Sequence, residues 1–115
     1  MYYKPKYINR RKVWWKPGEV NHKPIKLDPM TWKILCQDNI RILPGIITVA
    51  LSFGLEISGG VTLVSLVQEL LKMKCIIQNG IIIENTPDII IMIQNNSSEA
   101  LDILPGQELC LLRYV

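Results

Sequence analysis

The sequence predicts an all-β domain, a barrel or sandwich, preceded by an extended basic arm. Its 115 residues leave room for one domain. From Ile40 onward Ile, Leu and Val dominate, and β-branched side chains favour strands because they lose χ1 freedom in a helix. Short apolar runs alternate with turn residues at the regular spacing of all-β folds. We therefore expect an arm over residues 1–29 and a single β domain over residues 30–115.

The first part of the body is expected to consist of short strands separated by turns. Pro44-Gly45 is a turn dipeptide, and Ser58-Gly59-Gly60 ends a further apolar run. After Val67 the apolar spacing fits both a strand and a helix, and we expect a short turn of helix within residues 68–74. The strands are expected over residues 32–36, 40–42, 46–51, 54–57 and 61–67.

The second part of the body contains one strong turn signal. Asn79-Gly80 is typical of a two-residue hairpin turn, so residues 75–77 and 81–83 are expected to pair with each other. Residues 85–88 are expected to turn, and the uninterrupted apolar run of residues 89–93 predicts a strand buried on both faces. Two further strands are expected over residues 100–104 and 109–114.

The arm differs from the body in composition and charge. Pro5, Pro17, Pro24 and Pro29 remove backbone donors, which excludes a long helix or a central strand. Residues 1–28 carry eight Lys/Arg and two acidic residues, a net charge of +6, whereas the remainder carries five Lys/Arg and eight acidic residues, a net charge of −3. A basic arm on an acidic body suits a nucleic acid, an anionic membrane or an acidic protein surface.

The arm also interleaves aromatic with basic side chains, which a solvated tail seldom does. The preferred interpretation is that the rings pack in a groove of a neighbouring subunit, with lysines at the rim. The second is nucleic-acid binding, in which the cations meet phosphates and the rings stack on bases. An anionic membrane or another host protein is a third. The candidate contact residues are Tyr2, Tyr3, Lys4, Lys6, Tyr7, Arg10, Arg11, Lys12, Trp14, Trp15 and Lys16.

The residues needed for catalysis or metal binding are scarce. His22 is the only histidine, and Cys36, Cys75 and Cys110 stand far apart, so no catalytic triad, metal site or cofactor is expected. The cysteines lie in apolar stretches and are expected to be buried free thiols of a reducing compartment. The first residues lack the apolar region of a signal peptide, and no uncharged run is long enough to span a membrane. An intracellular protein is expected, in the cytoplasm, the nucleus or a virion.

From about Asp38 to the C-terminus, the order and spacing of the turns resemble those of the trimeric dUTPase family. The resemblance implies a jelly-roll-like β-barrel that assembles as a homotrimer. It covers roughly two-thirds of the chain, with spacing kept and few identities. The segments that carry it are residues 38–45, a strand and Pro-Gly turn; 53–57 with the Gly59-Gly60 turn; Leu71-Lys72 followed by Gly80-Ile81-Ile82; 89–97, ending in Asn-Asn-Ser; and 104–112.

The family's catalytic positions are not kept. Its phosphate-binding Arg-Ser-Gly motif falls on Leu66, Val67 and Gln68. The aspartate that orients the attacking water falls on Ile83, which has no proton to exchange. The tyrosine that stacks on deoxyribose falls near Thr86 or Pro87, and the family's metal-binding aspartate motif and Gly-rich tail have no counterpart.

The sequence therefore predicts that the chain is not an enzyme. We expect a structural or assembly protein of a virus, capsid-associated or accessory, that self-associates through its barrel. The alternative is a binding module whose arm contacts nucleic acid or a host protein. A residual dUTPase or nucleotide binder is the third hypothesis.

Overall fold

The computed structural model describes residues 12–15, 20–58, 61–82 and 86–115. Within these ranges the chain forms eleven strands and one short helix, α1 (Gln68–Lys72), so the expected all-β fold is confirmed. The strands are β1 (Lys12–Trp15), β2 (Ile25–Asp28), β3 (Thr31–Leu35), β4 (Ile40–Ile42), β5 (Ile47–Ser58), β6 (Thr62–Leu66), β7 (Cys75–Ile77), β8 (Ile81–Ile82), β9 (Thr86–Asn95), β10 (Leu101–Ile103) and β11 (Glu108–Tyr114).

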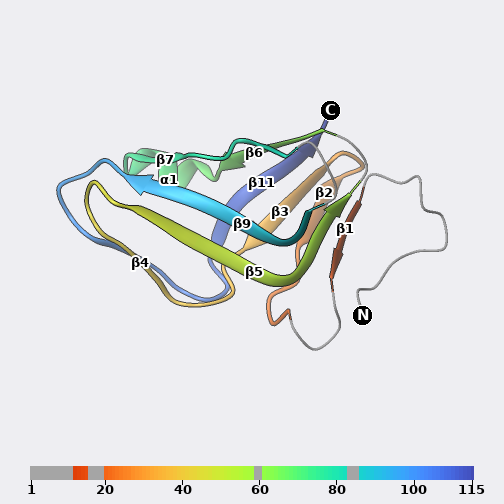
Figure 1. Ribbon diagram of the computed structural model, residues 1–115, viewed down its shortest axis with the longest axis horizontal. Helices are drawn as coiled ribbons and strands as arrows, with labels where there is room; N and C mark the ends of the chain where they lie inside the picture. The colour runs from red at the N-terminus through yellow and green to blue at the C-terminus, as the bar shows by residue number, and fades with distance from the viewer. Residues whose placement is uncertain (1–11, 16–19, 59–60, 83–85) are drawn as a thin grey trace.

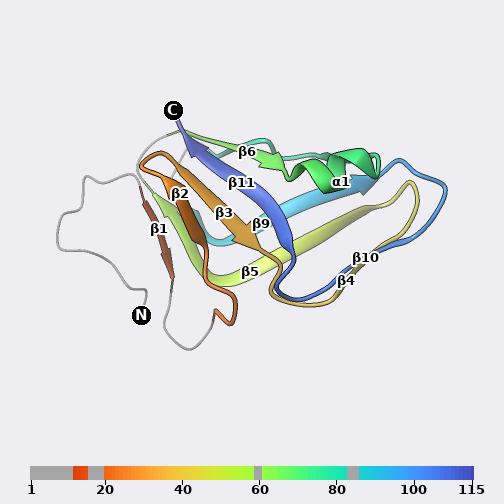
Figure 2. The same ribbon diagram turned by 180° about the vertical axis from the view of Figure 1, so that it is seen from behind.

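Two antiparallel sheets form the two layers of the molecule, which Figures 1 and 2 show from opposite sides. The four-stranded sheet has the order β1-β5-β9-β7, and the five-stranded sheet has the order β2-β3-β11-β6-β8. A separate two-stranded ribbon joins β4 and β10. The architecture is the sandwich that the regular spacing of strands predicts.

The hydrophobic core lies between the two sheets. The four-stranded sheet contributes Ile57, Ile91 and Ile93, and the five-stranded sheet contributes Ile34 and Leu112, all of them fully buried. Successive side chains of a strand point to opposite faces, so one residue in two reaches this core. Each buried aliphatic side chain contributes about 1.5–3 kcal/mol to stability. The three cysteines are buried free thiols, as expected.

A single bent strand replaces two expected ones. The sequence predicts strands over residues 46–51 and 54–57, but β5 is continuous. From Ser52 to Glu56 the chain takes four steps, whereas the facing β9 residues, Ile89 and Pro87, are two steps apart. The extra residues form a bulge that bends the strand and lets pairing resume beyond it, as Figure 1 shows. The expected interruption was wrong because pairing with β9 continues on both sides of it.

The expected hairpin at Asn79-Gly80 is also wrong. β7 pairs with β9, whereas β8 pairs with β6 in the other sheet. A two-residue hairpin turn of the Asn-Gly type needs positive φ at both central residues. Among the described residues, positive φ occurs only at Gly45, Lys74 and Gly106. The chain therefore crosses from one sheet to the other at Asn79-Gly80 instead of folding back.

The strand β9 begins earlier than expected and is not buried on both faces within this chain. Thr86 already belongs to the strand, although residues 85–88 were expected to turn. Ile91 and Ile93 are fully buried, but the neighbouring Ile90 is 44% exposed. Only one face of the strand is covered by the second sheet.

The described parts of the first 29 residues belong to the chain's own sandwich. β1 is the edge strand next to β5, and β2 is the edge strand next to β3. Edge positions suit a proline-rich segment, because an edge strand tolerates a missing donor. Val13 and Val20 are part of the core, and the boundary expected at residue 29 lies in the turn between β2 and β3. No helix in the described part of the chain is long and apolar enough to cross a membrane.

Candidate functional site

The segment that matches the family's phosphate-binding motif lies largely in the core. Leu66 is the last residue of β6 and pairs with Cys110 of β11. Its side chain is 3% exposed and that of Val67 is 7% exposed. The Val67 amide donates to the carbonyl oxygen of Leu109 at 3.1 Å, so its backbone donor is also occupied. Only Gln68, at the start of α1, is exposed.

The other positions that the resemblance singles out are less fully described. Ile83 lies outside the described residues. Thr86 and Pro87 are the first residues of β9, where only the backbone is described.

A cavity of about 350 Å³ lies beside the Leu66-Val67 segment, next to α1. Among its described lining residues the charged side chains are all acidic: Glu69, Asp102 and Glu108. A triphosphate carries several negative charges, which carboxylates in the lining of the cavity would repel. The full described lining is Val67, Glu69, Leu70, Met73, Leu101, Asp102, Ile103, Gly106, Gln107 and Glu108.

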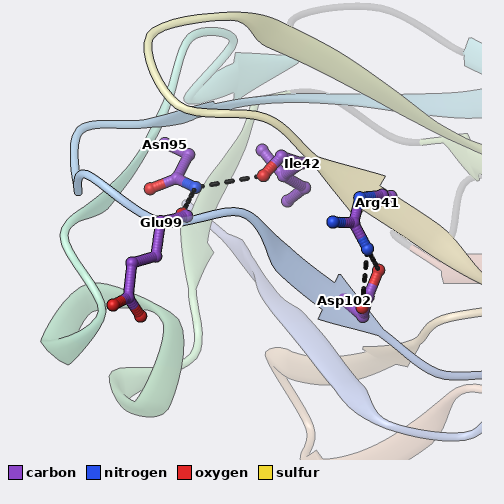
Figure 3. Close-up of polar contacts among 5 residues, drawn as sticks. All are labelled: Arg41, Ile42, Asn95, Glu99 and Asp102. Atoms are coloured by element: carbon purple, nitrogen blue, oxygen red, sulfur yellow. Dashed lines mark hydrogen bonds and ion pairs between the residues drawn. The ribbon is translucent and has the colours of Figure 1, made fainter.

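Two of these carboxylates are held by cations from neighbouring strands. The Arg41 Nη1 atom lies 3.2 Å from Asp102 Oδ2 across the β4–β10 ribbon, as Figure 3 shows. The Lys33 Nζ atom lies 2.7 Å from Glu108 Oε1. These cations are already paired with the protein's own carboxylates. The described lining of the cavity therefore includes no cation, the reverse of a phosphate site.

The described thiols are poor nucleophiles. Burial raises the pKa of Cys110 from 9.0 to about 12, so this thiol stays protonated at neutral pH. Burial also raises the pKa values of Cys36 and Cys75. The Cys36 Sγ atom donates to the carbonyl oxygen of Asp38 at 2.9 Å. No group of three or more His, Cys, Asp or Glu in the described ranges is placed to hold a metal ion.

His22 contacts other segments of its own chain. It is half-buried, and the Gln37 side chain accepts from its backbone amide at 3.1 Å and donates to its carbonyl oxygen at 2.6 Å. The imidazole lies against Gly106, where a Cβ atom would come within 3.3 Å of the ring. His22 thus helps fasten the segment before β2 to the turn before β11.

The candidate contact residues of the arm are only partly described. Trp15 is half-buried, and its ring meets that of Trp32 edge to face with centroids 6.3 Å apart. The Lys26 Nζ atom lies 5.9 Å from the centroid of the Trp32 ring. Lys12 and Trp14 lie in β1 as backbone only. The remaining candidates lie outside the described residues: Tyr2, Tyr3, Lys4, Lys6, Tyr7, Arg10, Arg11 and Lys16. Within the described part, Trp15 contacts its own chain, and contact of the arm with a neighbour stays a prediction.

Sequence reasoning did not single out one apolar surface, which we call the aliphatic strip. It consists of Ile47, Val49, Ile76, Ile90 and Met92 on the outer face of the four-stranded sheet. The register places Val49 opposite Met92, and places Gln94 between Ile47 and Ile76. The four Ile and Val side chains are 42–51% exposed.

The aliphatic strip has no charged side chain among its described residues. The polar residues beside it are Gln78 and Gln94, whose side-chain amides hydrogen bond to each other at 2.8 Å. Four aliphatic side chains that are each about half exposed give a patch on the order of 300 Å², a size at which exposed patches are often functional. The signal in the sequence was the lack of alternation in residues 89–93, which predicts a strand covered on both faces.

Comparisons with known proteins identify the fold. No protein-family model matches the chain, and no curated protein matches it in sequence. Twenty-four chains of solved structures match it. One is the native EIAV dUTPase, which is 16% identical, with a TM-score of 0.71 over 89% of this chain and 86% of the other. At this identity the likeness shows the fold alone: the chain has the β-fold of a dUTPase.

Proposed function

We propose that this chain is a non-enzymatic structural or assembly protein of a virus, present in the virion or the infected host cell. Its copies associate through their dUTPase-like barrels. The observation that carries the proposal is the aliphatic strip. Antiparallel sheets normally turn a polar face to water, and strands that are apolar on both faces are normally covered on both. In the described chain the second sheet covers only one face of β5 and β9.

The loss of catalysis is supported by the positions that the family uses for phosphate binding. Phosphoryl chemistry depends on positioning and on positive charge. Here Leu66 and Val67 belong to the core, and the described charged residues of the adjacent cavity are carboxylates. The pKa of the Cys110 thiol is also too high for it to serve as a nucleophile. These features together favour a retained fold without its chemistry.

A second copy is the occupant that best fits the aliphatic strip. The strip offers no charge with which to select a charged partner, and the paired amides of Gln78 and Gln94 need no ionic counterpart. A closed trimer, which the resemblance implies, needs two different surfaces on each copy. The outer face of the five-stranded sheet supplies a second one, where Leu63 lies opposite Ile81 and the two are 42% and 59% exposed. In the same assembly the N-terminal arm is proposed to lie on the neighbouring copy.

Two measurements on the full chain test the proposal. Light scattering after size exclusion is expected to give the mass of a trimer, and a monomer at every accessible concentration would remove the assembly function. Incubation with dUTP and magnesium is expected to release no pyrophosphate, and turnover would establish a residual dUTPase instead.

A third measurement addresses nucleic-acid binding through the arm. Affinity for single-stranded DNA or RNA that falls steeply with salt would favour the binding-module alternative, because phosphate contacts release counterions. Salt-independent or absent binding leaves assembly as the function.

A further inference from the structure

The side chain of Asn79 attaches the crossover between the two sheets to β9. Its Nδ2 atom donates to the carbonyl oxygen of Ile90 at 2.6 Å, and its Oδ1 atom accepts from the Met92 amide at 2.9 Å. Just before it, the Gln78 amide donates to the Met92 carbonyl oxygen at 2.8 Å. The backbone of β7 and of Gln78 thus hydrogen bonds to β9, and the side-chain amide of Asn79 makes the next hydrogen bonds to the same strand.

The next residue bonds to the opposite sheet. The Gly80 carbonyl oxygen accepts from the Val64 amide of β6 at 2.7 Å. Adjacent residues thus attach to β9 in one sheet and to β6 in the other. The following strand, β8, has two residues and pairs with β6 at the edge of its sheet. In the described part of this edge, the Asn79-Gly80 crossover is therefore one attachment beside the β8–β6 pairing.

The same dipeptide has a specific chemical reactivity. Glycine has no side chain to shield its nitrogen, so the Gly80 nitrogen, on losing its proton, can attack Cγ of Asn79. A C–N bond forms to close a succinimide, the bond from Cγ to Nδ2 breaks, and the nitrogen leaves as ammonia. Water then opens the ring to aspartate or isoaspartate, so that amide and water become carboxylate and ammonia. The attack needs a freely rotating amide, and here β9 holds both of its polar atoms.

We infer that Asn79-Gly80 is a deamidation site that β9 masks in the folded chain, and that its conversion loosens the attachment of the crossover to β9. Aspartate still accepts from the Met92 amide, but it has no donor for the Ile90 carbonyl oxygen and places a negative charge beside it. Isoaspartate additionally lengthens the backbone by one carbon, which displaces Gly80 from its bond with Val64. Either product weakens the attachment of β8, whose Ile81 is already 59% exposed. Deamidation is thus slow in the folded chain. Once it has occurred, the hydrogen bond to the Ile90 carbonyl oxygen cannot form again.

The first test compares rates in two states of the full chain. The protein is incubated folded, and separately in urea, in the same mildly alkaline buffer, and peptide mapping by mass spectrometry follows conversion at Asn79. Because reaction in the folded chain requires local opening that breaks two hydrogen bonds, its rate is expected to be lower by about tenfold or more. Equal rates in the two states would overturn the masking.

Gly80→Ala provides a matched chemical control. A Cβ at this position would lie 3.5 Å from the Val64 carbonyl oxygen and 3.9 Å from an Ile77 methyl group, which are ordinary contacts, so the variant is expected to fold. Its added methyl group hinders attack by the nitrogen, and conversion in urea is expected to slow. Conversion in urea at an unchanged rate would show that the reaction does not pass through the Gly80 nitrogen.

The second test measures the consequence by hydrogen exchange. In aged protein, in which isoaspartate lengthens the backbone, the amides of Met92 and Val64 are expected to exchange several-fold faster. In Asn79→Asp, whose carboxylate still accepts from the Met92 amide, the faster exchange is expected at Val64. Asn96→Asp is the control, since Asn96 is an exposed residue in the turn after β9. Unchanged exchange in both the aged protein and Asn79→Asp would overturn the proposed loosening of the crossover.

Discussion

The buried side chain of Asn95 donates a hydrogen bond to the backbone carbonyl oxygen of Ile42 at 3.0 Å, as Figure 3 shows. The same Nδ2 atom donates to the carbonyl oxygen of Glu99 at 2.8 Å, and Oδ1 accepts from the amide and the hydroxyl of Ser97 at 2.9 and 2.7 Å. One fully buried amide thus joins the end of β9, the end of β4 and the turn that precedes β10. These bonds hold in place the β4–β10 ribbon, which carries Arg41 and the cavity-lining Asp102.

Replacing Asn95 with alanine is expected to destabilise the fold by about 2–4 kcal/mol, because it leaves buried backbone groups without partners and creates a cavity. Urea unfolding followed by circular dichroism measures the change. Asn96→Ala is the matched control and is expected to stay within about 0.5 kcal/mol, since Asn96 is exposed. Similar losses in the two variants would show that the amide of Asn95 is not what holds the ribbon.

Introducing the arginine of the dUTPase motif is expected to unfold the protein instead of activating it. Leu66→Arg places a charge where the side chain is 3% exposed, which costs about 4 kcal/mol or more. Gln68→Arg, at an exposed position of α1, is the control and is expected to leave the unfolding midpoint nearly unchanged. A stable Leu66→Arg variant that binds dUTP by calorimetry would contradict the assignment of Leu66 to the core.

Alanine substitutions at three glycines distinguish the cost of a positive φ from the cost of a steric contact. Gly106 has φ +86° and a Cβ there would meet the His22 ring at 3.3 Å, whereas Gly45 has φ +74° with open space around it. Gly106→Ala is expected to cost about 1–3 kcal/mol, Gly45→Ala about 1 kcal/mol, and Gly80→Ala less than about 0.5 kcal/mol. Thermal unfolding of the three variants measures the order, and a larger loss at Gly80 than at Gly106 would contradict it.

Much of the strand layout could be predicted from sequence because it depends on local features. The period of two in residues 61–67 and the turn at Pro44-Gly45 act within a few residues, and the strands that they predict are present. The crossover at Asn79 could not be predicted, because its geometry is set by β9 and β6, which are distant in sequence. Local turn preference favoured a hairpin, and long-range pairing prevailed.

The candidate site shows the same division. The residue types alone show that positions 66, 67 and 83 carry neither an arginine nor a carboxylate. The sequence does not tell whether both apolar faces of residues 89–93 are covered, because this depends on how many layers the chain forms. The sequence pattern required two covering layers and the fold provides one, which leaves Ile90 exposed. The surface proposed for assembly is therefore the place where the sequence-based prediction of burial failed for the single chain.

Stability is expected to fall as the pH rises above 9.0, in part through Cys110. Burial raises the pKa of this thiol to about 12 in the folded chain, so it stays protonated while the unfolded thiol ionises from about 9.0 upward. Its contribution is therefore fully present below pH 9.0 and is lost between pH 9.0 and about 12. Cys110→Ala is expected to show a shallower fall of unfolding free energy across this window, and an unchanged slope would mean that Cys110 does not contribute.

The aliphatic strip is expected to be sensitive to charge in a way that other exposed aliphatic positions are not. Val49→Lys places an ammonium group in the centre of the uncharged strip, where a covering copy would remove it from water, and the assembly is expected to dissociate towards monomer. Leu71→Lys is the matched control, because Leu71 in α1 is 50% exposed and Val49 is 51% exposed. Light scattering gives the masses, and circular dichroism checks that both variants fold. An unaffected mass for Val49→Lys, or equal dissociation of the two variants, would show that copies of this chain meet elsewhere than on the strip.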